Sequence, residues 1–218
     1  MQNRNILAGF ILWVTTLGFG QSAPDPWLIV TSGVEGPLNL HTTHSELLRV
    51  YGKANVTERD GIEGFSGDME YVTVLFAKDP ERAIEIIWRD EEKKTVPAFV
   101  TVRGFKTRWH AARGISLGTS LKDLERLNGQ SFKLAGFGWD YSGTVTSWEN
   151  GALAVELDGG HGRVLVRLDS PPRSDISEKE VSDVSGDRDF SSQHPAMQKL
   201  NPRAYEVMWE FPSWEQKR

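Results

Sequence analysis

Two histidines three residues apart, His41 and His44, have a spacing that could bring two imidazoles to one metal ion. The pair lies at a predicted helix start and lacks the glutamate of the zinc-protease motif, and no third ligand can be identified. Cysteine is absent from all 218 residues, which excludes disulfides, thiol chemistry and Cys-type zinc sites. We therefore predict neither a metal site nor a cofactor.

Patterns of nucleophilic catalysis are also missing from this sequence. There is no Gly-x-Ser-x-Gly turn, and the five histidines lie in loop-like or helix-edge contexts. His161, set among glycines, fits a hairpin tip. Asp183, Asp187 and Asp189 could bind calcium, but they depart from the EF-hand spacing, and a solvated acidic turn is the preferred interpretation. The sequence favours a protein without a catalytic site.

Aromatic residues gather in Gly136–Gly143, which reads GFGWDYSG. Its glycines match neither the dinucleotide nor the P-loop pattern, so a kinked strand-turn-strand is predicted. Phe137, Trp139 and Tyr141 are the candidate binding residues, as an exposed patch for a protein or a sugar ring. Core packing is the alternative role for the aromatic residues of this chain, and inward alternation predicts it for three tryptophans, Trp88, Trp148 and Trp209.

The elements that would position these side chains are organised around a repeated stretch. Ile115–Gly129 aligns without a gap on Leu38–Gly52, 77 positions earlier. The two stretches share five identities, Leu40/Leu117, Thr42/Thr119, Leu47/Leu124, Arg49/Arg126 and Gly52/Gly129. Each copy predicts an apolar lead-in, a Ser/Thr cap, a helix of about two to three turns and a glycine stop. The chain is therefore predicted to contain two tandem modules.

Each predicted module is a short helix followed by an antiparallel β-meander, which gives an α+β fold. The first module spans residues 31–112, with strands predicted at 70–77, 83–89 and 99–102 and a further strand or link at 106–112. The second spans 113–211, with strands predicted at 132–137, 143–148, 152–158, 163–168 and 204–211. Residues 170–193 predict a long polar loop, and Pro195 opens a short helix in 194–201.

The N-terminus predicts export. Arg4 precedes a mainly apolar stretch, Ile6–Phe19, which is too short to span a bilayer comfortably, and small residues follow. Residues 1–23 are therefore a predicted signal peptide with a cut within 20–23, and an uncleaved anchor is the alternative. We expect a periplasmic or extracellular protein with no stable membrane insertion after cleavage. A net charge of −5 argues against nucleic acid as a partner.

The duplicated pattern in Gly114–Gly129, matched more loosely in Leu38–Gly52, resembles the tandem modules of the β-lactamase inhibitory protein and the related outer-membrane assembly lipoproteins. Those proteins carry disulfides or a lipidated cysteine, which this sequence lacks, so their specific activities do not transfer. The resemblance implies a module that binds proteins. We expect an exported, non-catalytic, inhibitor-like binding protein; a secreted hydrolase and a carbohydrate-binding module are the alternatives.

Overall fold

The computed structural model describes residues 25–29, 38–63, 69–104, 106–154, 162–169 and 175–212. Its helices are α1 (His44–Tyr51), η1 (Ala112–Gly114, a 3₁₀ turn), α2 (Leu121–Asn128), α4 (Glu178–Ser182) and α5 (Pro195–Leu200). Its strands are β1 (Val56–Glu63), β2 (Met69–Leu75), β3 (Ile84–Trp88), β4 (Pro97–Arg103), β5 (Lys133–Ala135), β6 (Val145–Ser147), β7 (Arg163–Asp169), β8 (Asp189–Ser191) and β9 (Arg203–Glu210). The α+β class predicted from the sequence is confirmed.

Both predicted helices begin at the predicted caps. The Ser120 hydroxyl accepts a hydrogen bond from the Asp123 amide at 3.2 Å, and Thr43 accepts one from the Glu46 amide at 3.1 Å. Such a cap satisfies one of the backbone N–H groups that a helix start leaves free. Gly129 ends α2 in the left-handed conformation with φ 76°, which glycine adopts without steric cost.

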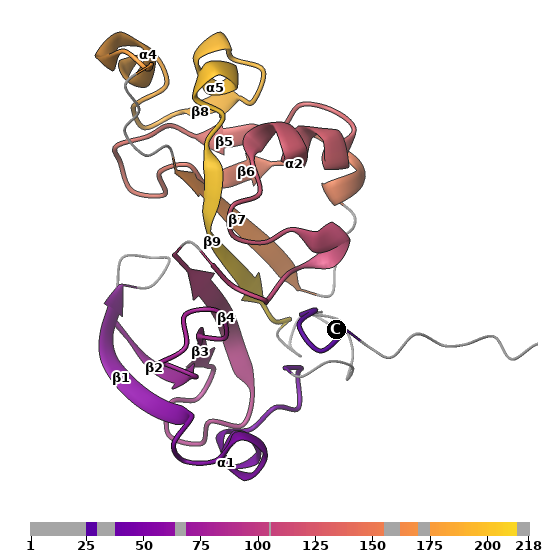
Figure 1. The fold of residues 1–218 in the computed structure, drawn as a ribbon, viewed down its shortest axis with the longest axis vertical. Helices are drawn as coiled ribbons and strands as arrows, with labels where there is room; N and C mark the ends of the chain where they lie inside the picture. The colour runs from indigo at the N-terminus through magenta and orange to yellow at the C-terminus, as the bar shows by residue number, and fades with distance from the viewer. Residues whose placement is uncertain are drawn as a thin grey trace, which may run out of the picture.

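A six-stranded antiparallel sheet, ordered β1-β2-β3-β4-β9-β7, runs along the molecule (Figure 1). Strand β9, the last element of the chain, lies between β4 and β7 and pairs with both. The pairing aligns Val102, Val207 and Val166 across three strands on one face of the sheet. Sequence-distant strands thus form the middle of the sheet.

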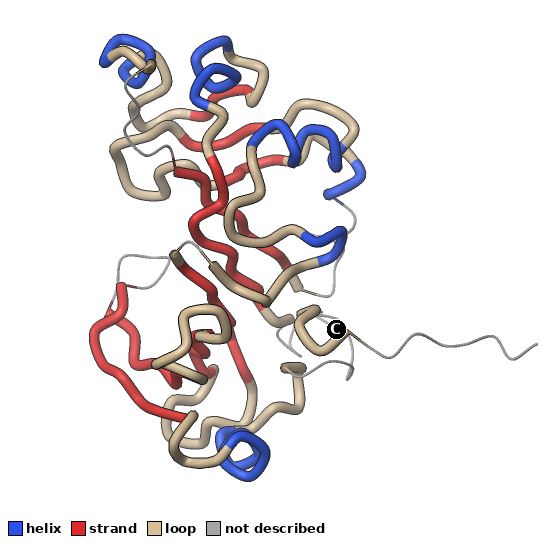
Figure 2. The backbone as a smooth tube through the Cα atoms, viewed as in Figure 1, coloured by secondary structure: helices blue, strands red, loops and turns tan. Residues whose placement is uncertain are grey.

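The second sheet has three strands in the order β6-β5-β8. It lies in the half of the molecule that also carries α2, α4 and α5, whereas α1 lies at the opposite end (Figures 1 and 2). The sheets meet where the Leu168 amide of β7 donates to the Gly143 carbonyl at 2.9 Å. The short β5–β6 connection is therefore attached directly to the long sheet.

One buried apolar cluster extends through both halves. Val100 and Val102 of β4 share it with Val166 of β7 and with Val207 and Trp209 of β9. The three tryptophans predicted to pack are all buried. Trp88 also donates its indole N–H to the Thr73 hydroxyl at 2.8 Å. A smaller cluster of Val72 and Val74, with Ile87 packed on it, lies apart from this core.

The predicted strand at 152–158 is wrong where the structure describes it, because residues 152–154 are helical. The alternating leucines and valines suggested a strand, but a tertiary contact decides the backbone here. The Asn128 side chain, at the end of α2, accepts a hydrogen bond from the Leu153 amide at 3.1 Å. Residues 155–158 lie outside the described part of the chain.

The polar segment 170–193 is not one loop over its described residues, 175–193. It contains α4 and β8, and two of its apolar residues, Val184 and Phe190, are buried. Two further differences concern the first half of the chain. Strand β1 was not predicted, because its sequence VTERDGIE is mostly polar, and residues 106–112 form a link with an isolated bridge at His110 rather than a full strand.

The two-module repeat is not confirmed. Strands β2 to β4 form the predicted meander, with the unpredicted β1 beside β2, but the strands after α2 divide between two sheets. The boundary between 31–112 and 113–211 stays a prediction, although strands of both ranges build the long sheet. Within the described residues, none of the helices combines the length and the apolar character needed to cross a membrane.

Candidate functional site

The predicted aromatic segment forms the connection between β5 and β6, which we call the aromatic loop (Gly136–Gly143). Glycine is required at both of its ends. A Cβ atom on Gly136 would lie 2.4 Å from the Gly186 carbonyl oxygen. A Cβ on Gly143, whose φ is 68°, would lie 1.9 Å from the Leu168 carbonyl oxygen. Two other backbone segments therefore pack directly against the ends of the loop.

Backbone hydrogen bonds hold the aromatic loop against these segments. The Phe137 amide donates to the Val184 carbonyl at 3.0 Å, and the Gly186 amide donates back to the Phe137 carbonyl at 3.1 Å. On the other side the Gly143 carbonyl accepts from the amide of Leu168. The loop is thus fixed on two sides before any ligand is bound.

The tip of the aromatic loop is closed by its own hydrogen bonds. The Ser142 amide donates to the Trp139 carbonyl at 3.0 Å, and the Ser142 hydroxyl accepts from the Gly138 amide at 3.2 Å. Tyr141 has a φ of 60°, a left-handed conformation that non-glycine residues adopt at some cost in free energy. The surrounding hydrogen bonds offset this cost and give the tip one defined shape.

The three predicted aromatic residues differ in their exposure to solvent. The side chain of Phe137 belongs to the buried core, with 8% of the residue exposed. Trp139 is 61% exposed and Tyr141 is 48% exposed. A large aromatic side chain that is exposed to water gains no free energy from burial in the fold. It can gain that free energy when a partner covers it. Phe137 is therefore an anchor of the loop, and Trp139 with Tyr141 is the candidate contact surface.

Acidic side chains accompany the exposed pair. Asp140 lies between the two aromatic residues and is exposed. Asp187 and Asp189 are exposed on the segment that runs beside the loop, where Ala135 pairs with Asp189. The basic residue between them, Arg188, stacks on the Phe190 ring with its guanidinium carbon 4.7 Å from the ring centroid. These exposed charged groups, three carboxylates and one guanidinium, thus give the border of the loop a net negative charge.

The histidine sites do not assemble a catalytic centre among the described residues. His44 Nε2 lies 3.0 Å from Glu58 Oε1, and the other oxygen of Glu58 is 2.5 Å from Lys94 Nζ. Burial acts to raise the pKa of Glu58, but hydrogen bonds from Lys94 and Tyr71 outweigh it and hold that pKa below its usual value. Because every oxygen of this carboxylate has a partner, the cluster fixes α1 on the sheet.

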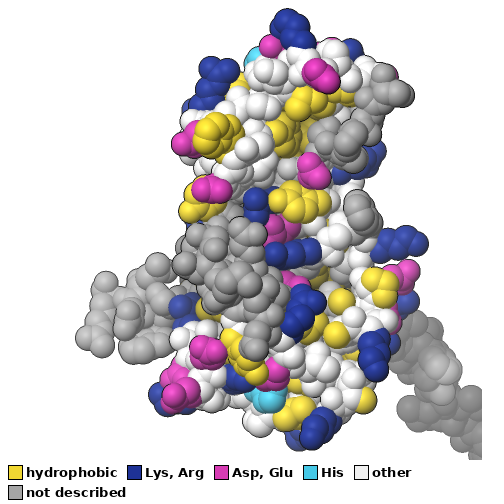
Figure 3. Space-filling model, turned by 90° about the vertical axis from the view of Figure 1, so that its left-hand side faces the viewer, with side chains coloured by type: hydrophobic (Ala, Val, Ile, Leu, Met, Phe, Trp, Pro, Cys, Tyr) yellow, Lys and Arg dark blue, Asp and Glu magenta, His cyan; other side chains and the backbone are white. Residues whose placement is uncertain are grey.

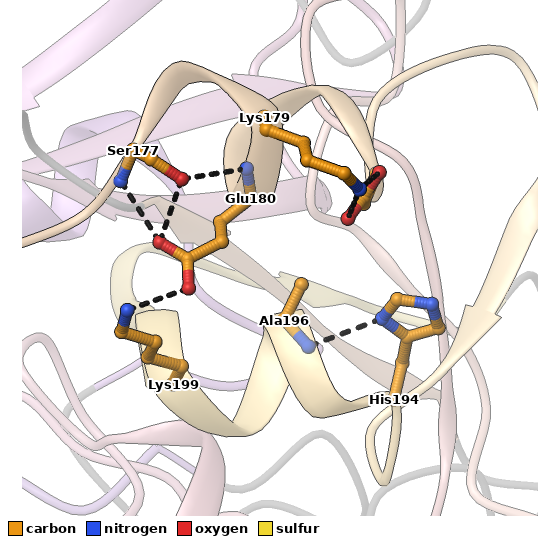
Figure 4. Close-up of polar contacts among 7 residues, drawn as sticks. Ser177, Lys179, Glu180, His194, Ala196 and Lys199 are labelled. Carbon is orange, nitrogen blue, oxygen red and sulfur yellow. Dashed lines mark hydrogen bonds and ion pairs between the residues drawn. The ribbon is translucent and has the colours of Figure 1, made fainter.

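Two other histidines have structural partners. His110 places Nε2 3.0 Å from Asp25 and Nδ1 3.1 Å from the Ala111 carbonyl, so both ring nitrogens are engaged. His194 caps α5 by accepting a hydrogen bond from the Ala196 amide at 3.2 Å (Figure 4). His41 is exposed, and His161 lies outside the described residues.

An ion pair between their side chains joins helices α4 and α5 (Figure 4). Glu180 completes a capping box with Ser177 and lies 2.5 Å from Lys199 of α5. The hydrogen bond from Lys199, with those from the Ser177 amide and hydroxyl, lowers the pKa of Glu180 to about 2. Asp183 accepts from Lys179 at 2.8 Å. Across the described ranges, no group of three His, Asp or Glu side chains is arranged to hold a metal ion.

The sequence reading missed a row of alternating charges across the long sheet. We call this row the ion ladder. It consists of Arg59 on β1, Glu85 on β3, Arg103 on β4, Glu206 on β9 and Arg167 on β7. Successive nitrogen–oxygen distances are 2.8, 3.4, 3.2 and 3.1 Å. Burial raises the pKa of Glu85, and the two arginines beside it act in the opposite direction.

Figure 3 shows basic and acidic side chains alternating down the middle of one side of the molecule. The ion ladder lies on the sheet face opposite Val102 and Val207, because its members alternate with these residues in register. Glu206 is almost fully enclosed, with 3% of its side chain exposed. The ladder joins five strands through pairs of opposite charge, so we assign it a structural role.

Comparisons with known proteins give little further guidance. No protein-family profile matches the chain, and no curated protein matches it. Among solved structures, the uncharacterized protein YfeY from Escherichia coli is similar, with 15% sequence identity and a TM-score of 0.40. The similarity covers 83% of this chain and 97% of that one.

Proposed function

We propose that this chain is an exported binding protein that engages a protein partner through the aromatic loop. The observation that carries the proposal is the 61% exposure of Trp139 on a backbone held by hydrogen bonds to Val184 and Leu168. The few residues that dominate the affinity of protein interfaces are enriched in tryptophan and tyrosine. A tip that is already ordered loses little conformational entropy on binding.

Export is the part of the proposal that rests on sequence alone. The predicted signal peptide, residues 1–23, lies outside the described residues. It supports a partner in the cell envelope or outside the cell. The measurement is the N-terminal sequence of the mature protein, which we expect to start within Gln21–Pro24.

The partners of His44, His110 and His194 support binding rather than catalysis. A general base needs a ring nitrogen that can reach a substrate, whereas His110 has both nitrogens engaged and His194 caps a helix. A described surface pocket lies beside β1 and the β2–β3 turn, lined by Phe76, Lys78 and Arg82 among others, and it contains no histidine.

The test is capture of cell-envelope and secreted proteins with the mature chain, compared between wild type and Trp139→Ala. A partner retained by the wild type and lost by the variant, with a saturable Kd, supports the proposal. The matched control is Val50→Ala, which removes another exposed apolar side chain, on α1 at the opposite end of the molecule. Turnover in a hydrolase screen that depends on His44 or His110 would refute the non-catalytic function.

A further inference from the structure

We propose that the aromatic loop recognises a cationic side chain, lysine or arginine, in an extended segment of its protein partner. This inference rests on the proposed function and specifies the chemistry of the same surface. The face of a tryptophan ring attracts a cation through its negative electron density, and indole is the strongest aromatic acceptor of this kind. Trp139 is 61% exposed on a loop whose backbone is held by hydrogen bonds.

The carboxylates near the aromatic loop select for the same ligand. Asp140, Asp187 and Asp189 are exposed, and in the described part of the chain none of their three carboxylates has a hydrogen-bond or ion-pair partner. Other carboxylates in that part are held by a basic side chain, as Asp79 is by Arg82 and Asp90 is by Lys93. The negative charge around Trp139 is therefore left for a ligand to neutralise.

The basic side chains close to the aromatic loop have other contacts. Lys133 lies 3.3 Å from Glu149, and Arg188 stacks on Phe190. Lys179 is held by Asp183 at 2.8 Å. Each of these three cations would have to give up an existing interaction before it could pair with a carboxylate beside the loop. A cation from another molecule meets no such competition.

The negative charge of this surface also disfavours other candidate ligands. A second copy of the chain would bring a protein of net charge −5 to an acidic border, so repulsion opposes that association. An acidic peptide would meet the same repulsion. A neutral sugar could stack on the ring but would leave the carboxylates without a counter-charge, whereas a basic segment satisfies both features.

The direct test is a titration of the mature chain with a 12-residue Gly/Ser peptide that carries three lysines. Binding is followed by the indole N–H signal of Trp139 in NMR spectra, assigned by its loss in Trp139→Leu. The matched probe is the same peptide with its lysines acetylated, which keeps the aliphatic stems and removes the charge. We expect saturable shifts with the lysine peptide, weaker binding at higher salt, and no shifts with the acetylated peptide.

Single substitutions distinguish the contribution of the Trp139 ring to binding from that of the carboxylates. Trp139→Leu keeps an apolar residue and is expected to raise the Kd of the lysine peptide about two- to tenfold. Asp140→Asn is expected to raise it by a similar factor, and Glu92→Gln, an exposed acid in the β3–β4 turn, is expected to leave it unchanged. Equal binding of the acetylated peptide, preference for a glutamate peptide, or no binding of the lysine peptide would overturn the inference. Capture of a partner that still depends on Trp139 would then show that the proposed function survives without it.

Discussion

The carbonyl of Gly143 accepts the amide of Leu168 at 2.9 Å, and the two backbones are so close that a Cβ on Gly143 would lie 1.9 Å from the Leu168 carbonyl oxygen. This contact attaches the aromatic loop to an edge strand of the long sheet. It makes the shape of the loop a property of the fold, because the loop cannot move away without breaking the junction of the two sheets.

Gly143→Ala is expected to destabilise the protein by about 2–4 kcal/mol, since the added methyl group meets backbone that cannot rotate aside. Denaturant unfolding of the two proteins measures the difference. The matched control is Gly138→Ala in the same loop, where φ is 85° but the added Cβ has open space. We expect it to cost only about 1 kcal/mol of backbone strain. Equal losses in the two variants would mean that the close approach to Leu168 has no consequence.

Phe137→Ala and Trp139→Ala are expected to differ sharply in stability although both remove an aromatic ring from one loop. Phe137 is buried, so its removal leaves a cavity and costs about 3–5 kcal/mol. Trp139 is mostly exposed, so its removal changes stability by about 0.5 kcal/mol or less. Thermal and denaturant unfolding measure both values. A large loss for Trp139→Ala would place that ring in the core and remove it from the contact surface.

Glu206→Ala is expected to destabilise the protein by about 3–5 kcal/mol, because it leaves Arg103 and Arg167 without their shared carboxylate in an enclosed position. The control is Glu210→Ala on the same strand, which breaks a more exposed pair with Arg163 and is expected to cost about 1 kcal/mol or less. If the two substitutions cost the same, the ion ladder would have no special role.

The α4–α5 contact predicts a pH dependence. The folded pKa of Glu180 is about 2, below its ordinary value of 4.5. The carboxylate therefore supports this contact above about pH 4.5, and that support is lost as the pH falls toward 2. NMR titration of the Glu180 side chain measures the folded pKa directly. Lys199→Met should move it upward toward the ordinary value, and an unchanged pKa in that variant would show that Lys199 is not the main cause.

Local signals in the sequence were sufficient for the two capped helices. The hydroxyl of Ser120, the carboxylate of Asp123 and the glycine at 129 act within a few residues of one another, so their spacing predicts α2 directly. The alternation of apolar and polar residues likewise predicts strand β7. The same pattern gives the wrong structure after Gly151, because the side chain of Asn128, far away in sequence, holds the Leu153 amide in a helical turn.

The candidate site was predicted only in part. Spacing grouped Phe137, Trp139 and Tyr141, but which rings are exposed depends on Val184 and Leu168, which approach the loop from other segments. The ion ladder was invisible for the same reason. Arg103 and Glu206 meet because β4 and β9 pair across about one hundred residues, and a single sequence does not give that register.

The most direct measurement of the central claim is the affinity of a captured partner for the wild-type chain and for Trp139→Ala, determined by calorimetry with purified proteins. An exposed ring that anchors an interface is expected to contribute about 2 kcal/mol or more, so the Kd should rise about thirtyfold while the unfolding free energy stays within about 0.5 kcal/mol of wild type. An unchanged Kd in a folded Trp139→Ala protein would contradict the assignment of the aromatic loop as the binding surface.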